Sequence, residues 1–247
     1  MQEARIHVRS AIIIGASSGI GRALAKVLAS SGYCLGLASR RGELLREVAE
    51  EIRSTSFVKV IDVSRPVEAM HNLRELIAEM KDVELFVISS GIGAINPQLD
   101  WEPESETIAV NVSGFTAMAN VAIAHLEQRG SGCLVGISSI AALLGNPDAP
   151  AYDASKAFMS NYLQGVRYRF AKLGLPVVVT DVQPGFVDTP MAKAARKFWV
   201  ASPEKAAEQI FTAIRRRKKH VYVTRRWRLV AWLIKATPDW LLSKLLK

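Results

Sequence analysis

Short apolar runs alternate with longer amphipathic segments along most of this 247-residue chain. The first run, 10–14, is rich in isoleucine, and in the segment after it, 20–31, apolar residues recur three and four positions apart, which is helical spacing. Apolar strands that alternate with helices predict a parallel sheet with helices on both faces. The predicted strands are 10–14, 34–38, 57–61, 84–88, 133–138, 176–182 and 220–224, and the predicted helices are 20–31, 42–54, 66–80, 105–129, one containing Tyr152, and 203–217.

This pattern predicts one α/β domain over residues 1–224, with about seven strands. We find no internal repeat, low-complexity segment or linker within it. The composition changes after Thr224, where Arg, Trp, Leu and Lys dominate. Residues 225–247 are therefore predicted to be a basic amphipathic C-terminal extension.

The composition is that of a folded protein, with 49% hydrophobic and 22% charged residues. By our reading no stretch approaches the roughly 20 apolar residues that span a bilayer, and Met1 to Ser10 lacks the apolar run of a signal peptide. We therefore expect a cytoplasmic protein. Cys34 and Cys133 are expected to be reduced, buried thiols, and no Cys/His spacing indicates a metal site.

The formal net charge of +9 is concentrated at the C-terminal end. Residues 215–247 hold eleven of the 32 Lys and Arg residues and one of the 23 acids, so the rest of the chain carries a net charge of about −1. The extension suits either a helix docked over the active site or at a subunit interface, or peripheral contact with the cytoplasmic face of a membrane. Binding to nucleic acid is the least favoured alternative, because three of the five bases in 215–219 fall on a predicted helix end, where the macrodipole favours cations.

A glycine loop, Gly15-Ala-Ser-Ser-Gly19-Ile-Gly21, follows the first predicted strand and opens the first helix. It departs from the G-x-G-x-x-G spacing, but the physical requirements are the same: a sharp turn, a close approach of backbone to phosphate, and close helix packing. A helix N-terminus also favours an anion. The loop therefore predicts a site for a dinucleotide.

The second predicted strand ends in Ser39-Arg40-Arg41, where an acidic residue would favour NAD. Arginine matches phosphate bidentately, so this strand end favours the 2′-phosphate of NADP.

Tyr152 and Lys156 are one helical turn apart, with Ser139 thirteen residues upstream, so the pair is expected to share a helix face. A free tyrosine has a pKa of about 10. A neighbouring ammonium favours the phenolate and is expected to lower that pKa. The three residues predict a proton-transfer site.

These motifs together resemble those of the short-chain dehydrogenase/reductase family over about residues 10–224. The resemblance implies a Rossmann-type, doubly wound single domain. It rests on the glycine loop, Asp62-Val63, Asn111-Val112, Ser138-Ser139, Tyr152-Asp-Ala-Ser-Lys156 and Pro184-Gly185-Phe-Val-Asp-Thr189.

The resemblance also implies a role for each matching residue. Tyr152 would be the general acid for carbonyl reduction, tuned by Lys156. Ser139 would hydrogen-bond the substrate oxygen, and Asn111 would interrupt its helix and hold a water in a proton relay. The implied cofactor-binding residues are Gly15, Ser17, Ser18, Gly19, Ile20, Gly21, Ser39, Arg40, Arg41, Asp62, Val63, Gly91, Tyr152, Lys156, Pro184, Gly185, Val187 and Thr189.

One motif departs from the family pattern, because Ile88-Ser89-Ser90-Gly91 stands where Asn-Asn-Ala-Gly is usual. Gly91 keeps the backbone role, whereas serine replaces the hydrogen bonds of asparagine only in part.

The expected function is interconversion of a secondary alcohol and a ketone or aldehyde with NADP(H). An apolar or lipid-like substrate is expected from Phe186, Met191, Phe198 and Trp199, with Leu143 and Leu144, although ordinary helix packing explains these residues equally well. A homo-oligomer, dimer or tetramer, is implied by the resemblance. The alternative is a non-catalytic nucleotide-binding sensor or scaffold that retains the fold.

Overall fold

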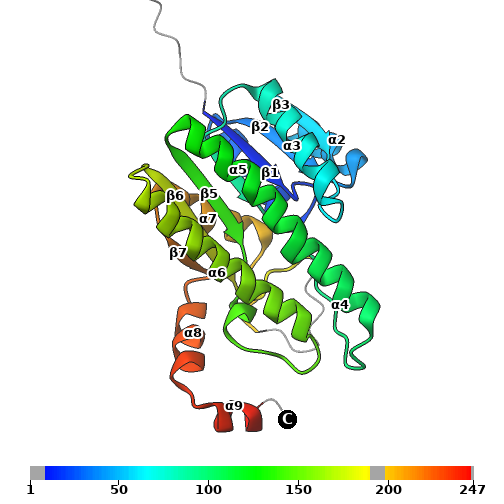
Figure 1. Ribbon diagram of the computed structural model, residues 1–247, viewed down its shortest axis with the longest axis vertical. Coiled ribbons are helices and arrows are strands. Elements are labelled where there is room, and N and C mark those ends of the chain that lie inside the picture. Colours follow the sequence, from blue (N-terminus) through cyan, green and yellow to red (C-terminus); the bar gives the residue numbers. More distant parts are fainter. Residues whose placement is uncertain (1–8, 190–197, 246–247) are drawn as a thin grey trace, which may run out of the picture.

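The computed structural model describes residues 9–189 and 198–245 and contains the predicted parallel sheet (Figure 1). Its seven strands run in the order β3-β2-β1-β4-β5-β6-β7, and each pairs in parallel with its neighbours. The chain therefore folds as the single α/β unit predicted, with its strand order reversing beside β1. The strands are β1 (Ser10–Ile14), β2 (Cys34–Ser39), β3 (Ser56–Val60), β4 (Leu85–Ile88), β5 (Gly132–Ile137), β6 (Val177–Pro184) and β7 (His220–Val223).

Helices cover both faces of the sheet, and two hydrophobic clusters divide the core between those faces. Alternate residues of β1 enter opposite clusters: Ile12 and Ile14 pack on one side, and Ala11 and Ile13 on the other. This is why the strand is apolar from Ala11 to Ile14. One cluster includes α1 (Gly19–Ser30), α2 (Gly42–Glu51) and α7 (Pro203–Arg215), and the other includes α3 (Pro66–Met80), α5 (Phe115–Arg129) and α6 (Pro150–Lys172).

The helix predicted over 105–129 begins earlier, at Trp101, and is interrupted in the middle. It consists of α4 (Trp101–Ile108), a π-helical turn η1 (Ala109–Gly114) and α5. By length and composition, the continuous segment Trp101–Arg129 qualifies as a membrane span, contrary to our reading of the sequence. Most of its apolar window is buried, and α5 contributes to the core, so here it is a core helix.

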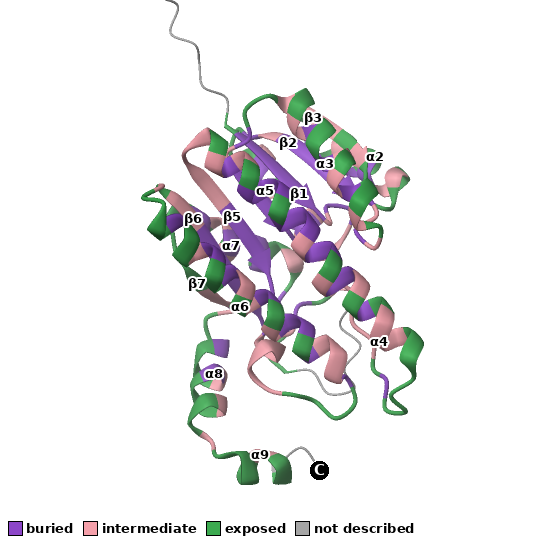
Figure 2. Ribbon diagram, in the orientation of Figure 1, coloured by how far each residue is buried: buried purple, intermediate pink, exposed green. Residues whose placement is uncertain are grey.

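Residues after β7 form two short helices, α8 (Trp227–Ala236) and α9 (Asp239–Leu245), which extend away from the sheet (Figure 1). α8 contacts β7 and the short 3-10 turn η2 (Ile140–Leu143). Figure 2 shows that most of both helices is exposed.

Gly114, at the end of the π-helical turn, packs against the chain after β3. A substitution of this glycine tests how close that packing is. A Cβ atom there would lie 2.5 Å from the Val63 carbonyl oxygen. We predict that Gly114→Ala lowers the free energy of unfolding by about 1–3 kcal/mol, because neighbouring backbone must move. Urea unfolding measures the change.

Gly165 is the matched control, because it also lies in a helix, α6, and a Cβ atom there would meet open space. Gly165→Ala is expected to stabilise the protein by up to about 1 kcal/mol. Equal effects of the two substitutions would contradict the packing argument.

Candidate active site

The glycine loop lies at the carboxyl end of β1, pressed against the chain that leaves β4. Gly15 has φ +94°, and a Cβ atom there would lie 2.5 Å from the Ser90 nitrogen. A Cβ atom on Gly21 would overlap the Gly15 carbonyl oxygen, so α1 also packs directly on the turn. Gly19 lies against Thr189, with 3.0 Å between its ideal Cβ position and Thr189 Cγ2. The loop is thus a backbone-lined cradle at a helix N-terminus, which suits a phosphate group.

Arg41 lies over this loop. Its guanidinium donates to the Ser17 hydroxyl at 2.8 Å and the Ser18 hydroxyl at 2.6 Å, and its backbone nitrogen donates to the Ser39 hydroxyl at 3.1 Å. Both Arg40 and Arg41 are exposed. Predicted residues from two separate motifs therefore meet at one cationic position beside the cradle.

Asp62 follows β3 on the same edge of the sheet. Its carboxylate accepts hydrogen bonds from the backbone and side chain of Ser64, at 3.0 and 2.7 Å. The side-chain bond from Ser64, and to a lesser extent the charge of Arg40, lowers the pKa of Asp62. Val63 is buried against Gly114, whereas Asp62 is partly exposed to solvent.

α6 brings the proton-transfer residues to the carboxyl edge of β4 and β5. The helix begins at Pro150, and proline is well suited to the first turn of a helix. Tyr152 lies in this first turn, and Lys156 lies one turn later. Lys156 Nζ lies 5.7 Å from the centre of the Tyr152 ring. The predicted pair therefore shares a helix face.

Two glycines after β4 make room for this pair. An ideal Cβ atom on Gly91 would lie 3.3 Å from Lys156 Nζ and 3.2 Å from Asn111 Oδ1. One on Gly93 would lie 3.0 Å from the Tyr152 ring. The sequence pattern does not indicate Gly93, because the role of this glycine depends on the Tyr152 ring, 59 positions away along the chain.

Lys156 is only 3% exposed, and its ammonium donates to the Ile137 carbonyl at 3.2 Å. Burial lowers the pKa of Lys156 to about 8, and the charge of Asp181 partly offsets the effect. Asp181, on β6, is itself buried. The sequence alone did not indicate Asp181, which lies inside an otherwise ordinary predicted strand, 176–182.

Asp181 belongs to a buried polar network beneath the site. It accepts hydrogen bonds from the Ser138 hydroxyl at 2.5 Å and the Gln183 amide at 3.2 Å. His220 Nδ1, from β7, lies 3.4 Å from Asp181 Oδ2, the oxygen that also accepts from Gln183. These contacts fix the orientation of the carboxylate that faces the Lys156 charge.

Burial raises the pKa of Tyr152, and a hydrogen bond with Ser139 only partly opposes this. We expected the opposite direction from the neighbouring ammonium. Desolvation is the larger effect here, and Lys156 directs its ammonium to the Ile137 carbonyl. Ser139 also accepts a hydrogen bond from the Ala141 nitrogen at 3.1 Å, which fixes the start of η2.

Asn111 lies in the π-helical turn, and so its helix is interrupted as predicted. Its side chain is fully buried. Its oxygen accepts from the Ile92 nitrogen at 2.9 Å, and its nitrogen donates to the Ile92 carbonyl at 2.8 Å and the Ser155 hydroxyl at 2.9 Å. The amide thereby links η1, the chain after β4, and α6.

Ile88, Ser89 and Ser90 take the places of Asn, Asn and Ala in the family pattern. Ser89 donates its backbone nitrogen to the Ile14 carbonyl at 2.8 Å, which continues the sheet. The Ser90 hydroxyl is buried and has no hydrogen-bond partner among the described residues. Ser90 takes the alanine position of the pattern, and its hydroxyl adds no hydrogen bond there among the described residues.

The segment after β6 carries the remaining predicted residues, and the C-terminal extension packs on it. Pro184 ends β6, and Gly185 lies directly against the Trp227 indole, where a Cβ atom would overlap the ring. Val187 pairs with Ala201 in an isolated parallel bridge. Predicted Met191 lies outside the described residues.

Aromatic rings cluster around this contact. Phe198 stacks on Trp227 with 4.9 Å between ring centres, and Phe186 and Trp199 approach Trp227 edge-on at 5.4 and 6.4 Å. The first turn of α8 is therefore docked beside Phe186, Phe198 and Trp199, three of the residues from which we expect an apolar substrate.

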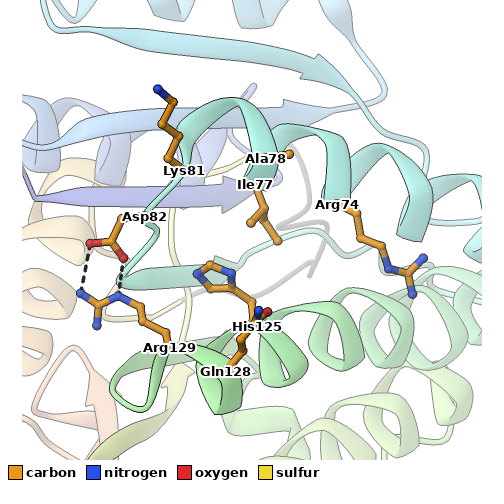
Figure 3. Close-up of a pocket in the computed structure, with 8 residues that line it drawn as sticks. All are labelled: Arg74, Ile77, Ala78, Lys81, Asp82, His125, Gln128 and Arg129. Carbon is orange, nitrogen blue, oxygen red and sulfur yellow. Dashed lines mark hydrogen bonds and ion pairs between the residues drawn. The ribbon is translucent and has the colours of Figure 1, made fainter.

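A separate hollow of about 400 Å³ lies between α3 and α5 (Figure 3). The Arg129–Asp82 ion pair lies on one side of it, and His125 Nε2 donates to the Val83 carbonyl at 3.0 Å. None of the predicted site residues lines it. We therefore place the site at the carboxyl edge. Within the described part of the chain, no group of three or more His, Cys, Asp or Glu side chains is arranged to hold a metal ion.

Curated relatives match most of the chain. An uncharacterized oxidoreductase of Myxococcus xanthus is 34% identical over 189 residues, which cover 74% of each protein. The human inactive hydroxysteroid dehydrogenase-like protein 1 is 31% identical over 193 residues, covering 74% of this chain and 57% of that protein.

Solved structures share the fold. A 3-ketoacyl-ACP reductase from Sinorhizobium meliloti is 29% identical, with a TM-score of 0.77 over 86% of this chain and 96% of its own. A 3-ketoacyl-(acyl-carrier-protein) reductase from Brucella melitensis, complexed with NADH, has a TM-score of 0.79 at 22% identity, over 87% of this chain and 95% of its own.

The short chain dehydrogenase family model matches residues 9–198, which span the cradle and the Ser139, Tyr152 and Lys156 cluster. Together with the relatives, the sheet order and the geometry of that cluster, this match establishes that the chain belongs to the short-chain dehydrogenase/reductase family of oxidoreductases.

Proposed function

We propose that this protein uses NADP(H) to interconvert a secondary alcohol and a ketone or aldehyde, and that its substrate is apolar. The observation that carries the proposal is the meeting of Tyr152, Ser139 and Lys156 at the edge of the sheet that also holds the glycine cradle. A proton donor, a second hydroxyl and a buried cation beside a phosphate cradle are the groups that carbonyl reduction needs.

Tyr152 supplies the proton in this proposal. Because burial raises the pKa of Tyr152, the phenol stays protonated at neutral pH and is ready to donate to a carbonyl oxygen. The Ser139 hydroxyl, which hydrogen-bonds Tyr152, donates to the same oxygen as negative charge develops there. The Lys156 ammonium supplies nearby positive charge. The nicotinamide, when bound, supplies or accepts the hydride.

The cofactor preference rests on Arg41 and Arg40. The loop around Gly15 and Gly21 is a cradle that a Cβ atom would fill, and it therefore fits a dinucleotide phosphate. The Arg41 guanidinium stands at its rim, bonded to Ser17 and Ser18. A planar cation at this position favours an additional phosphate, as NADP carries, over a plain ribose.

An apolar substrate is supported by the aromatic cluster of Phe186, Phe198 and Trp199 around Trp227. Leu143 and Leu144 are partly buried just beyond Ser139. The 29% identical structure from Sinorhizobium meliloti is a 3-ketoacyl-ACP reductase, whose name specifies a keto group on an acyl chain. We also propose that the protein works as a homo-oligomer.

The competing candidate is a nucleotide-binding protein without catalytic activity. The similarity to a human relative named inactive favours it. Retention of Ser139, Asn111, Tyr152 and Lys156 in one cluster favours the enzyme, because cofactor binding alone does not require a proton donor.

The role of Tyr152 is tested by Tyr152→Phe. We expect kcat for NADPH-dependent reduction of apolar ketones to fall by about 10²–10⁴-fold, because the proton donor is lost. NADPH binding, followed by fluorescence, is expected to remain.

The control is Tyr162→Phe, which removes a hydroxyl from the same helix and keeps the ring that packs on Phe115 and Phe158. Its kcat is expected to match that of the unaltered protein. Unchanged turnover in Tyr152→Phe would refute the assigned donor, and binding of NADPH without turnover of any carbonyl in a broad panel would favour the non-catalytic candidate.

Cofactor preference is tested by Arg41→Ala. We expect KM for NADPH to rise roughly 10- to 100-fold, as for loss of a charge-assisted hydrogen bond, with a much smaller change for NADH. Arg46→Ala is the control, since Arg46 is an exposed arginine of the neighbouring helix α2. If NADPH and NADH were affected equally, the proposed contact with the 2′-phosphate would be wrong.

The burial of Lys156 gives a pH-dependent signature in stability. Its folded-state pKa, about 8, is below the ordinary lysine pKa of 10.5, so between these values the unfolded chain binds more protons and stability rises with pH. We predict that Lys156→Met raises the free energy of unfolding at pH 7 by roughly 1–3 kcal/mol. The difference should shrink as the pH rises from 8 to 10.5. Urea unfolding across this range measures it, and a constant difference would show that the ammonium is not desolvated.

A further inference from the structure

The C-terminal helix α8 has two different faces. Trp227 and Ala231, one turn apart, are 3% and 1% exposed and face the body of the protein. Trp227 lies on Gly185 and in the aromatic cluster described above. The helix is thus fixed to the body at its first turns.

The other face of α8 is apolar and exposed. Leu229, Trp232 and Leu233 are 64%, 67% and 55% exposed, and they recur at the three- and four-residue spacing of one helix face. On α9, Trp240 is 63% exposed and Leu241 lies beside it. We call these five residues the tail face. Figure 1 shows α8 and α9 projecting away from the sheet, and Figure 2 shows them largely exposed.

Cations border the tail face. Arg225 and Arg226 precede it, and Arg228 and Lys235 lie on α8 itself; all four are exposed. Lys244 Nζ lies 5.4 Å from the Trp240 ring centre. Within residues 225–247 six bases stand against one acid, Asp239. An apolar face with tryptophans and a basic border suits the boundary between headgroups and acyl chains of an anionic bilayer.

We propose that the tail face binds an anionic lipid surface, with Leu229, Trp232, Leu233, Trp240 and Leu241 entering the interface. Charge decides between this occupant and a second copy of the chain. A symmetric contact between two tail faces would bring two segments of net charge +5 together, whereas anionic headgroups neutralise them. Lipid binding of this kind places the helix in the membrane plane, since α8 is too short to span a bilayer.

Co-sedimentation of the full chain with vesicles tests the proposal, and it is independent of enzymatic activity. We expect binding to vesicles of phosphatidylcholine with phosphatidylglycerol, and much weaker binding to phosphatidylcholine alone. Trp232→Ser combined with Leu233→Ser is expected to weaken binding at least about tenfold. Replacing Arg225, Arg226 and Arg228 with Gln should weaken binding to the anionic vesicles by roughly fivefold per charge and remove most of its salt dependence.

The matched control is Val67→Ser combined with Leu173→Ser, which removes two exposed apolar side chains outside the tail face. It is expected to bind vesicles like the unaltered chain. Light scattering of each variant without lipid supplies the second measurement. Equal sedimentation of the tail-face and control variants would overturn the proposal, as would absence of vesicle binding by the unaltered chain. A change of oligomeric mass confined to the Trp232 and Leu233 variant, without vesicle binding, would identify the tail face as a subunit contact instead.

Discussion

The burial of the Lys156 ammonium is the constraint on which the rest of the site depends. Moving a charged amine out of water is costly, and the lowering of its pKa to about 8 expresses that cost. The fold offsets it with the Ile137 carbonyl and with the charge of Asp181, which Ser138 and Gln183 hold in place. β5, β6 and α6 must therefore keep fixed positions relative to one another, because they carry Ile137, Asp181 and Lys156. The residues that support the cation are as important to the site as those that face a substrate.

Close backbone approach is the second requirement, and glycine meets it at each junction. Gly15 presses on Ser90, Gly93 on the Tyr152 ring, and Gly185 on Trp227. In each case a single added methyl group would displace backbone or an aromatic ring. The site is thus assembled from chain segments in direct contact. These contacts bring together the ends of β1, β4 and β6, the helix α6 and the C-terminal extension.

The sequence predicted the features that depend on local spacing. Buried strands, the glycine loop, and Tyr152 and Lys156 one turn apart all follow from periodicity, and the structure has them. It did not predict the role of Asp181, a single acidic residue inside the strand β6, or the contact of Gly93 with Tyr152. The direction of the Tyr152 pKa shift was also missed, because it depends on how completely the fold excludes water. Such features depend on distances between segments that are far apart in the chain.

The helical period of α8 places one set of apolar residues against the body of the protein and another set on its exposed face. The four-residue repeat that buries Trp227 and Ala231 leaves positions 229, 232 and 233 on the opposite side. Any rotation of α8 that hid its exposed face would withdraw Trp227 from Gly185. The exposed face is therefore a geometric consequence of docking the helix beside the site. The tail face therefore lies on the side of α8 opposite the contact of Trp227 with Gly185.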